Sequence, residues 1–258
     1  MSMTGPGETS TGTASLSDIK RALLDAKLTR QRAEAAERNR IAPVPRTGRL
    51  QVSDQQRHLW TLHQLAPGQP VYNVPFVLRL RGTLDTTALA GALRGLVARH
   101  EALRTRFGSE HGVPYQSVDD TPASWPLPVT DLSGLPDGER DDRSRALVES
   151  RARAPFDLEN GPVFRTDLLR LAADDHLLVL CLHHIVTDGW SVGIVTRELA
   201  ALYGSGDASL PELAVQPADH AAWQRRRLSG DGLRNQIDYW RTTLAGVPAI
   251  DFPTDRPR

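Results

Sequence analysis

The chain has little cysteine, few aromatic residues and no net charge. Of its 258 residues one is cysteine, 5% are aromatic, and 31 basic side chains balance 31 acidic ones. A single cysteine cannot form an internal disulfide, and Cys181 lies in the apolar run 177–182, which indicates a buried, reduced thiol. Because the charges balance, no net field favours nucleic acid or an anionic membrane surface, and we expect neither as a partner.

Long hydrophobic runs and targeting features are also missing. No segment approaches the roughly 20 apolar residues that a membrane-spanning helix needs. The N-terminus lacks the basic and apolar regions of a secretory signal peptide, so we expect a cytoplasmic protein. Residues 1–15 are rich in Gly, Ser and Thr, which predicts a disordered leader.

The rest of the chain alternates between helical and extended patterns without internal repeats. Residues 16–46 are predicted to form an N-terminal helix and a Pro-containing linker. Strands are then predicted at residues 71–81, 103–107, 114–118, 163–171 and 176–184, and helices at residues 53–66, 85–100, 140–154, 189–204, 218–228 and 231–245. The two most apolar strands, 163–171 and 176–184, should be central in a sheet. This alternation predicts an α/β fold or an α+β sandwich.

Titratable side chains gather where the strand at residues 176–184 ends. His183 and His184 are followed closely by Asp188 and Gly189. Because side chains alternate along a strand, the two histidines should point to opposite faces, which disfavours a shared metal site, and no metal is expected. One histidine can then face a cavity as acid, base or hydrogen-bond partner, while the other is held in the core. A purely structural role for both histidines is the alternative.

The residues after the histidines suggest how the turn is built. A carboxylate at a corner between strand and helix more often fixes the loop by pairing with an arginine than performs chemistry, so Asp188 is expected to be structural. Gly189 would let the backbone turn tightly or approach a substrate closely.

The run from His183 to Gly189 resembles the HHxxxDG signature of condensation domains from nonribosomal peptide synthetases. The following pair, Trp190-Ser191, resembles the subtype that joins an L-configured donor to an L-configured acceptor. Three further stretches are similar to motifs of this family and occur in the expected order, at residues 53–60, 99–107 and 217–223.

These three stretches differ in how closely they follow the family pattern. Residues 99–107 match RHExLRTxF at every fixed position. In the stretch 53–60, Gln55 stands where a small residue is usual, and His58 stands where arginine is common. In the last stretch, which resembles YxDFAxW, Pro217 replaces the tyrosine and His220 replaces the phenylalanine.

The resemblance implies a fold, a reaction and partners. The fold would be a chloramphenicol acetyltransferase-like lobe with a central mixed sheet covered by helices. Residues 47–258 would form the N-terminal lobe of a condensation domain, and the C-terminal lobe would be absent. The implied reaction joins a donor acyl or peptidyl thioester to an acceptor aminoacyl thioester through an amide bond. The thioesters would be carried on phosphopantetheine of donor and acceptor peptidyl carrier proteins, and this chain would bind no cofactor itself.

The resemblance also implies roles for single residues. His184 would be the catalytic histidine, which positions the acceptor amine or takes its proton. The other members of the active-site motif would be His183, Asp188 and Gly189. Structural support would come from Arg99 and Arg104, as framework ion-pair partners, and from Trp223, as a core residue.

Other interpretations differ in how the site is completed. The chain could be a piece of a larger synthetase or a natural single lobe. A free-standing acyltransferase would need identical subunits to complete its site, and the stretches 99–107 and 219–223 speak against it. A noncatalytic module that recruits a carrier or tailoring protein is a further alternative. Because one lobe holds half of the site, we expect this chain alone to be inactive or weakly active, and to self-associate through its exposed interface.

Overall fold

The computed structural model describes residues 16–205, 210–248, 253 and 256, so the predicted disordered leader at residues 1–15 lies outside the described residues. The chain divides into two compact units, residues 1–40 and residues 41–258. In the first unit the predicted helix is confirmed as α1 (Leu16–Asn39). None of the helices in the described part of the chain is long and apolar enough to cross a bilayer.

The second unit contains a four-stranded sheet in the order β2-β7-β6-β5. The strands β2 (Asn73–Arg81), β7 (Asp175–His183) and β6 (Phe164–Ala172) are antiparallel neighbours, whereas β5 (Val129–Asp131) runs parallel to β6, so the sheet is mixed. The prediction that the two most apolar strands are central is confirmed. The sequence pattern missed β5, because three residues are too few to show an alternation.

A second, smaller sheet has the order β1-β4-β3. Its strands are β1 (Leu50–Gln51), β3 (Thr105–Glu110) and β4 (Val113–Val118). The predicted hairpin is confirmed, but its first strand begins later than expected, since residues Glu101–Arg104 form the 3-10 turn η1. The hairpin closes through His111 and Gly112, both of which have positive φ values of 50° and 77°.

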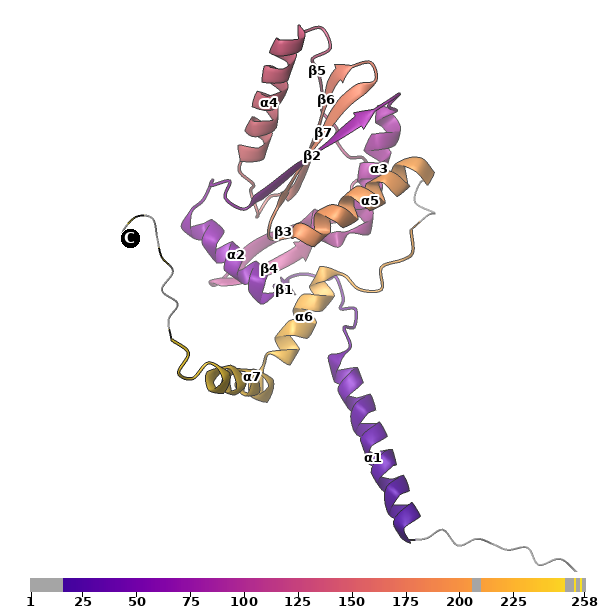
Figure 1. Ribbon diagram of the computed structural model, residues 1–258, viewed down its shortest axis with the longest axis vertical. Coiled ribbons are helices and arrows are strands. Elements are labelled where there is room, and N and C mark those ends of the chain that lie inside the picture. Colours follow the sequence, from indigo (N-terminus) through magenta and orange to yellow (C-terminus); the bar gives the residue numbers. More distant parts are fainter. Residues whose placement is uncertain (1–15, 206–209, 249–252, 254–255, 257–258) are drawn as a thin grey trace, which may run out of the picture. The chain divides into compact units, whose positions relative to one another are not determined.

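Helices cover both faces of the larger sheet (Figure 1). One face is covered by α3 (Thr86–Arg99) and α5 (Gly189–Ser205), and the other by α4 (Asp137–Arg153). The helix α2 (Asp54–Leu65) begins at a capping box in which Ser53 and Gln56 bond each other's backbone N–H. Two further helices, α6 (Pro217–Arg227) and α7 (Gly230–Thr243), follow near the C-terminal end.

The alternation of side chains along β7 divides the core. Leu178, Leu180 and Leu182 are fully buried against α3 and α5, in the cluster that also contains Leu93, Leu96, Val195 and Leu199. On the opposite face, Cys181 packs with Trp60, Phe107 and Phe156. Burying each of these large side chains contributes about 1.5–3 kcal/mol, so the register of β7 is strongly fixed. This register determines which histidine enters the core where the strand ends.

Candidate active site

His183 is a core residue. Its side chain is 3% exposed, and its Nδ1 accepts a hydrogen bond of 3.1 Å from the backbone N–H of Ile185. The rings of Phe156 and His63 meet it edge to face, each with a centroid distance of 5.9 Å. Burial, with smaller contributions from His63 and His184, lowers the pKa of His183 to about 4. At neutral pH it is therefore an uncharged packing residue.

His184 faces the opposite way and is exposed. Its backbone N–H extends the ladder by donating to the carbonyl of Tyr72 at 2.8 Å. Its Nδ1 lies 2.7 Å from the backbone carbonyl oxygen of Thr187. Because a carbonyl oxygen only accepts hydrogen bonds, Nδ1 must carry the proton in the neutral ring, which leaves a lone pair on Nε2. His184 can therefore accept a proton or a hydrogen bond from a group in front of the ring.

His184 lines a cavity of about 210 Å³ in which all four motif stretches meet. The stretch 53–60 contributes residues of α2 and its cap, and the stretch 99–107 contributes Ala102. The histidine motif contributes the segment from His184 to Asp188 together with Ser191, and the last stretch contributes Pro217 and His220. Residues far apart in the sequence thus surround one histidine that has a free ring nitrogen.

Asp188 fixes the start of α5, but through a different partner from the one expected. Its Oδ1 accepts hydrogen bonds from the backbone N–H of Ser191, at 2.9 Å, and from the Ser191 hydroxyl, at 2.6 Å. These bonds lower the pKa of Asp188 below its usual value, and the bond from the Ser191 hydroxyl has the largest effect. The expected arginine is replaced by a serine because the unpaired N–H groups of the helix N-terminus lie within reach of the carboxylate.

Gly189 does not have the backbone role that the sequence suggested. Its φ is outside the left-handed region, so the turn does not require glycine. A Cβ added at this position would meet no atom within 4 Å. The position leaves room for a group from outside the chain to approach closely, so that interpretation of Gly189 stays a prediction.

The arginines of the second motif tie the lobe together. Arg99 Nε lies 3.0 Å from Glu198 Oε2, and His100 Nε2 lies 2.6 Å from the same oxygen, so the end of α3 is bound to α5. Arg104 donates to the backbone carbonyl of Asp119. Both arginines are thus occupied within the framework and do not line the cavity around His184.

Trp223 is less buried than expected for a core residue. It is partly exposed on α6, where its ring lies 5.5 Å from that of His220 and the guanidinium of Arg227 lies 5.5 Å above it. Its Nε1 is buried and has no hydrogen-bond partner within the described part of the chain. The aromatic side chain was correctly placed on α6, but it packs between polar neighbours rather than inside the sheet core.

A family model for the condensation domain matches residues 47–258. The chain belongs to the condensation domain family. It is 44% identical over 254 residues to phosphinothricin tripeptide synthetase PhsC of Streptomyces viridochromogenes, which covers 95% of this chain and 23% of that protein. It is 43% identical over 223 residues to malpinin synthetase of Mortierella alpina, which covers 84% of this chain and 3% of that protein.

Solved condensation-domain folds agree with this assignment. The X-domain from teicoplanin biosynthesis superposes with a TM-score of 0.71 at 33% identity, covering 85% of this chain and 48% of that one. The starter condensation domain of rhizomide synthetase RzmA superposes with a TM-score of 0.68 at 22% identity, which shows the fold alone. The expected chloramphenicol acetyltransferase-like lobe is confirmed. The chain spans about half the length of these solved structures and a small part of the curated synthetases.

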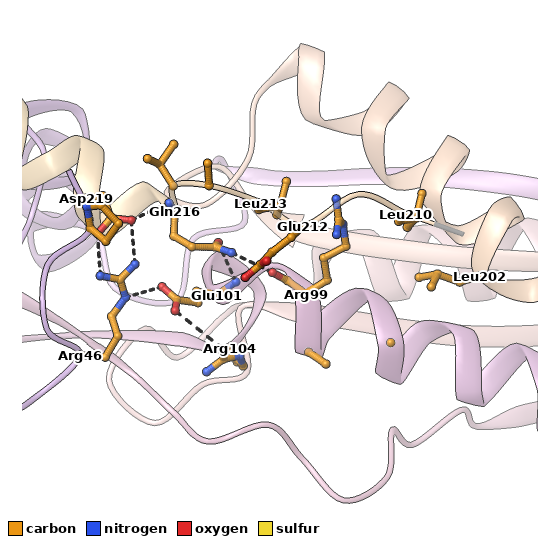
Figure 2. Close-up of a pocket in the computed structure, with 15 residues that line it drawn as sticks. Arg46, Arg99, Glu101, Arg104, Leu202, Leu210, Glu212, Leu213, Gln216 and Asp219 are labelled. Atoms are coloured by element: carbon orange, nitrogen blue, oxygen red, sulfur yellow. Dashed lines mark hydrogen bonds and ion pairs between the residues drawn. The ribbon is translucent and has the colours of Figure 1, made fainter. Parts of the chain in front are cut away.

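The sequence did not reveal that a buried carboxylate holds α6 in this condensation-domain lobe. Asp219 is 1% exposed and accepts hydrogen bonds from Arg46 at 2.6 and 2.9 Å, and from the backbone N–H groups of Val44 and Gln216 at 2.7 Å each. Figure 2 shows Arg46 between Asp219 and Glu101, to which Arg46 Nε donates at 2.6 Å. The one available signal was an acidic residue three positions after Gln216, a possible helix cap that is followed directly by a proline.

This network positions one wall of the cavity around His184. Burial acts to raise the pKa of Asp219, but the hydrogen bonds from Arg46 and from the two backbone N–H groups outweigh it, so the pKa is lowered and the carboxylate stays charged. The N-terminal turn of α6 is thereby fixed to the segment that precedes β1. Pro217 and His220, which flank Asp219, are presented to the cavity of His184 as a result.

Proposed function

We propose that this lobe forms amide bonds as part of a nonribosomal peptide synthetase condensation domain. The donor would be an acyl or peptidyl thioester and the acceptor an aminoacyl thioester, each on the phosphopantetheine arm of a peptidyl carrier protein. One observation carries the proposal: all four motif stretches of the family meet in a cavity of about 210 Å³ around His184, whose Nε2 is free to accept.

The proposed reaction needs little chemical activation by the protein. The acceptor amine attacks the carbonyl carbon of the donor thioester, a C–N bond forms, the C–S bond breaks, and the proton lost by nitrogen ends on the departing thiol. Because a thioester is already an activated acyl donor, holding the amine within reach of the carbonyl can supply much of the rate. Nε2 of His184 would accept a hydrogen bond from the amine and direct its lone pair towards the carbonyl, and could take its proton.

The geometry around His184 supports a positioning role. The hydrogen bond from Nδ1 to the Thr187 carbonyl holds the ring in one orientation and one tautomer. The Asp188 cap holds the other end of the same loop at the start of α5. Both contacts would keep Nε2 at a defined place in the cavity, which is what positioning catalysis needs.

The chain spans about half the length of the solved condensation domains, so we propose a C-terminal lobe and the two carrier proteins as its partners, in the cytoplasm. The test is a single-turnover assay with loaded donor and acceptor carriers, with and without a separately supplied C-terminal lobe. We expect amide with the lobe, little or none without it, and at least about a hundredfold less with His184→Ala. His58→Ala is the matched control, because His58 is exposed on α2 outside the cavity and should leave the rate unchanged.

A second candidate is recruitment without catalysis. It is favoured by the 32% identity to the X-domain that was solved in a complex with OxyB. A recruitment module has no use for a histidine with a free ring nitrogen in a cavity of motif residues. If no mixture forms amide while the chain still binds a partner protein, recruitment becomes the better explanation.

A further inference from the structure

The positions at which this chain departs from the family motifs are not scattered. Three of the four departures, Gln55, Pro217 and His220, line the cavity around His184. The fourth, His58, is exposed on α2 and does not line it. Gln55 and His220 thus bring polar side chains with N–H groups to positions where the family usually has a small residue and a phenylalanine, respectively.

Gln55 offers hydrogen-bond donors to the cavity. Its side chain is exposed, and its Oε1 accepts a hydrogen bond from Gln224 Nε2 at 3.2 Å. That contact fixes the orientation of the amide, since the oxygen must face Gln224. The Nε2 group of Gln55 is left with no partner within residues 16–205 and 210–248, so its N–H groups are available to a substrate.

His220 offers a second polar group. Its ring is held against Trp223 at a centroid distance of 5.5 Å, and its neighbour Asp219 is anchored by Arg46. Neither ring nitrogen has a hydrogen-bond partner in the described part of the chain. In either neutral tautomer the ring has one N–H donor, so the cavity contains donors from both α2 and α6.

Charge and size narrow what these donors can recognise. The carboxylate of Asp188 lines the same cavity, which disfavours a substrate group with a full negative charge. The cavity of this lobe, with a volume of about 210 Å³, has room for the side chain of one aminoacyl group. If His184 holds the acceptor amine, the acceptor side chain lies next to it, because it branches from the carbon that bears the amine.

We infer that Gln55 and His220 select the acceptor aminoacyl group and favour a neutral side chain with a hydrogen-bond-accepting oxygen, a hydroxyl or a carboxamide. This inference rests on the proposed function and adds the substrate class to it. Both donors are exposed in this lobe, where water can bond them. Once a second lobe covers the cavity and excludes water, a purely apolar side chain of the same shape would leave them unpaired, and that is the penalty by which the site discriminates.

The test compares acceptors of equal shape. The acceptor carrier is loaded with threonine or valine, and in a second pair with asparagine or leucine, and both compete for one donor in the presence of the C-terminal lobe. We expect kcat/KM to favour the polar member of each pair by about tenfold or more. His220→Phe and Gln55→Ala should each reduce this ratio, and together bring it near one by raising the use of the apolar acceptor. His58→Ala should leave the ratio unchanged.

A binding measurement keeps this inference separate from the reaction. Threonyl- and valyl-pantetheine, with the thioester replaced by an amide, are titrated into the chain with the C-terminal lobe and followed by calorimetry. Tighter binding of the threonyl compound, lost in His220→Phe, supports the inference even if no amide forms and the proposed function fails. If both compounds bind equally, or if the variants change polar and apolar acceptors by the same factor, Gln55 and His220 select nothing and the inference is wrong.

Discussion

Two adjacent histidines in this lobe have opposite environments because the strand that carries them alternates its side chains. His183 points to the face of the strand on which Cys181 packs, and its ring is enclosed by other rings. His184, one residue later, points into an open cavity, and its Nε2 has no hydrogen-bond partner among the residues that the structure describes. Residue type alone therefore does not say which histidine can be reached from the cavity. The face of β7 on which each lies decides it.

Burial of His183 makes the stability of the fold depend on pH. The unfolded residue takes a proton near pH 6.5, whereas the folded one, with its pKa lowered to about 4, stays neutral until lower pH. Between these values the unfolded state binds one more proton, so stability falls as the pH falls, by on the order of 3 kcal/mol in total. His183→Asn, which keeps an acceptor for the Ile185 N–H, should lose this dependence. Urea unfolding from pH 4 to pH 7 measures the difference, and parallel curves for the two proteins would contradict it.

The alternation that separates the two histidines was predictable from sequence, and the partners of the site were not. Opposite faces follow from strand periodicity once His184 is placed at a strand end. The serine that pairs with Asp188 and the arginine that pairs with Asp219 depend on where a helix starts and on a contact across 173 residues. The spacing of three residues between Asp188 and Ser191 is local, whereas nothing in the local sequence indicates that Arg46 reaches Asp219.

At the scale of elements, we expect the start of α5 to couple helix stability to the cavity around His184. Asp188→Ala removes the acceptor for two hydrogen bonds from Ser191 and should cost about 1 kcal/mol of stability. It should also lower the rate of amide formation, since the loop that orients His184 loses its fixed end. Asp85→Ala is the matched control, because Asp85 caps α3 through Thr87 and Ala88 away from the cavity. Denaturant unfolding measures the loss of stability in each variant, and the single-turnover assay measures the loss of rate. An equal loss of rate in Asp188→Ala and Asp85→Ala would rule out a local effect.

The contact between Arg46 and α6 should matter for both folding and the cavity. Arg46→Ala leaves the buried carboxylate of Asp219 without its charged partner, which should cost about 3 kcal/mol. Arg46→Ala combined with Asp219→Asn should recover part of this, because the uncompensated charge is gone. Arg49→Ala, which removes an exposed pair with Glu110, should change little. A double-mutant cycle by urea unfolding tests the coupling, and strictly additive effects would refute it.

Most helices and strands of the lobe could be predicted from the sequence because they are long enough to show a hydrophobic periodicity. The helices α3 and α5 and the central strands β6 and β7 were predicted within a few residues. The elements that the sequence pattern missed or misplaced are short or depend on distant contacts. The three residues of β5 form a strand only because β6 is beside them, and the turn η1 delays β3 after α3 has ended.

At the scale of the whole molecule, apolar side chains are exposed on the last helix. The helix α7 has no buried residues, and Leu233, Ile237 and Trp240 on it are 42–53% exposed. Such a surface on an isolated lobe should promote self-association. The replacement of Ile237 and Trp240 by serine should shift sedimentation velocity profiles towards the monomer. Leu65→Ser, at a single exposed leucine on α2, should not. A monomeric wild-type chain at all concentrations would contradict the prediction.

The buried thiol of Cys181 makes this lobe well suited to site-specific labelling. The sequence has one cysteine, its side chain is 2% exposed, and burial raises the pKa of its thiol. A maleimide dye reacts with exposed thiolates, so it should leave Cys181 untouched in the folded protein. Trp190, which is 83% exposed beside the histidine motif, could then be replaced by cysteine and would carry the only reactive sulfur. A fluorophore there would report directly when a carrier arm or a second lobe arrives at the site.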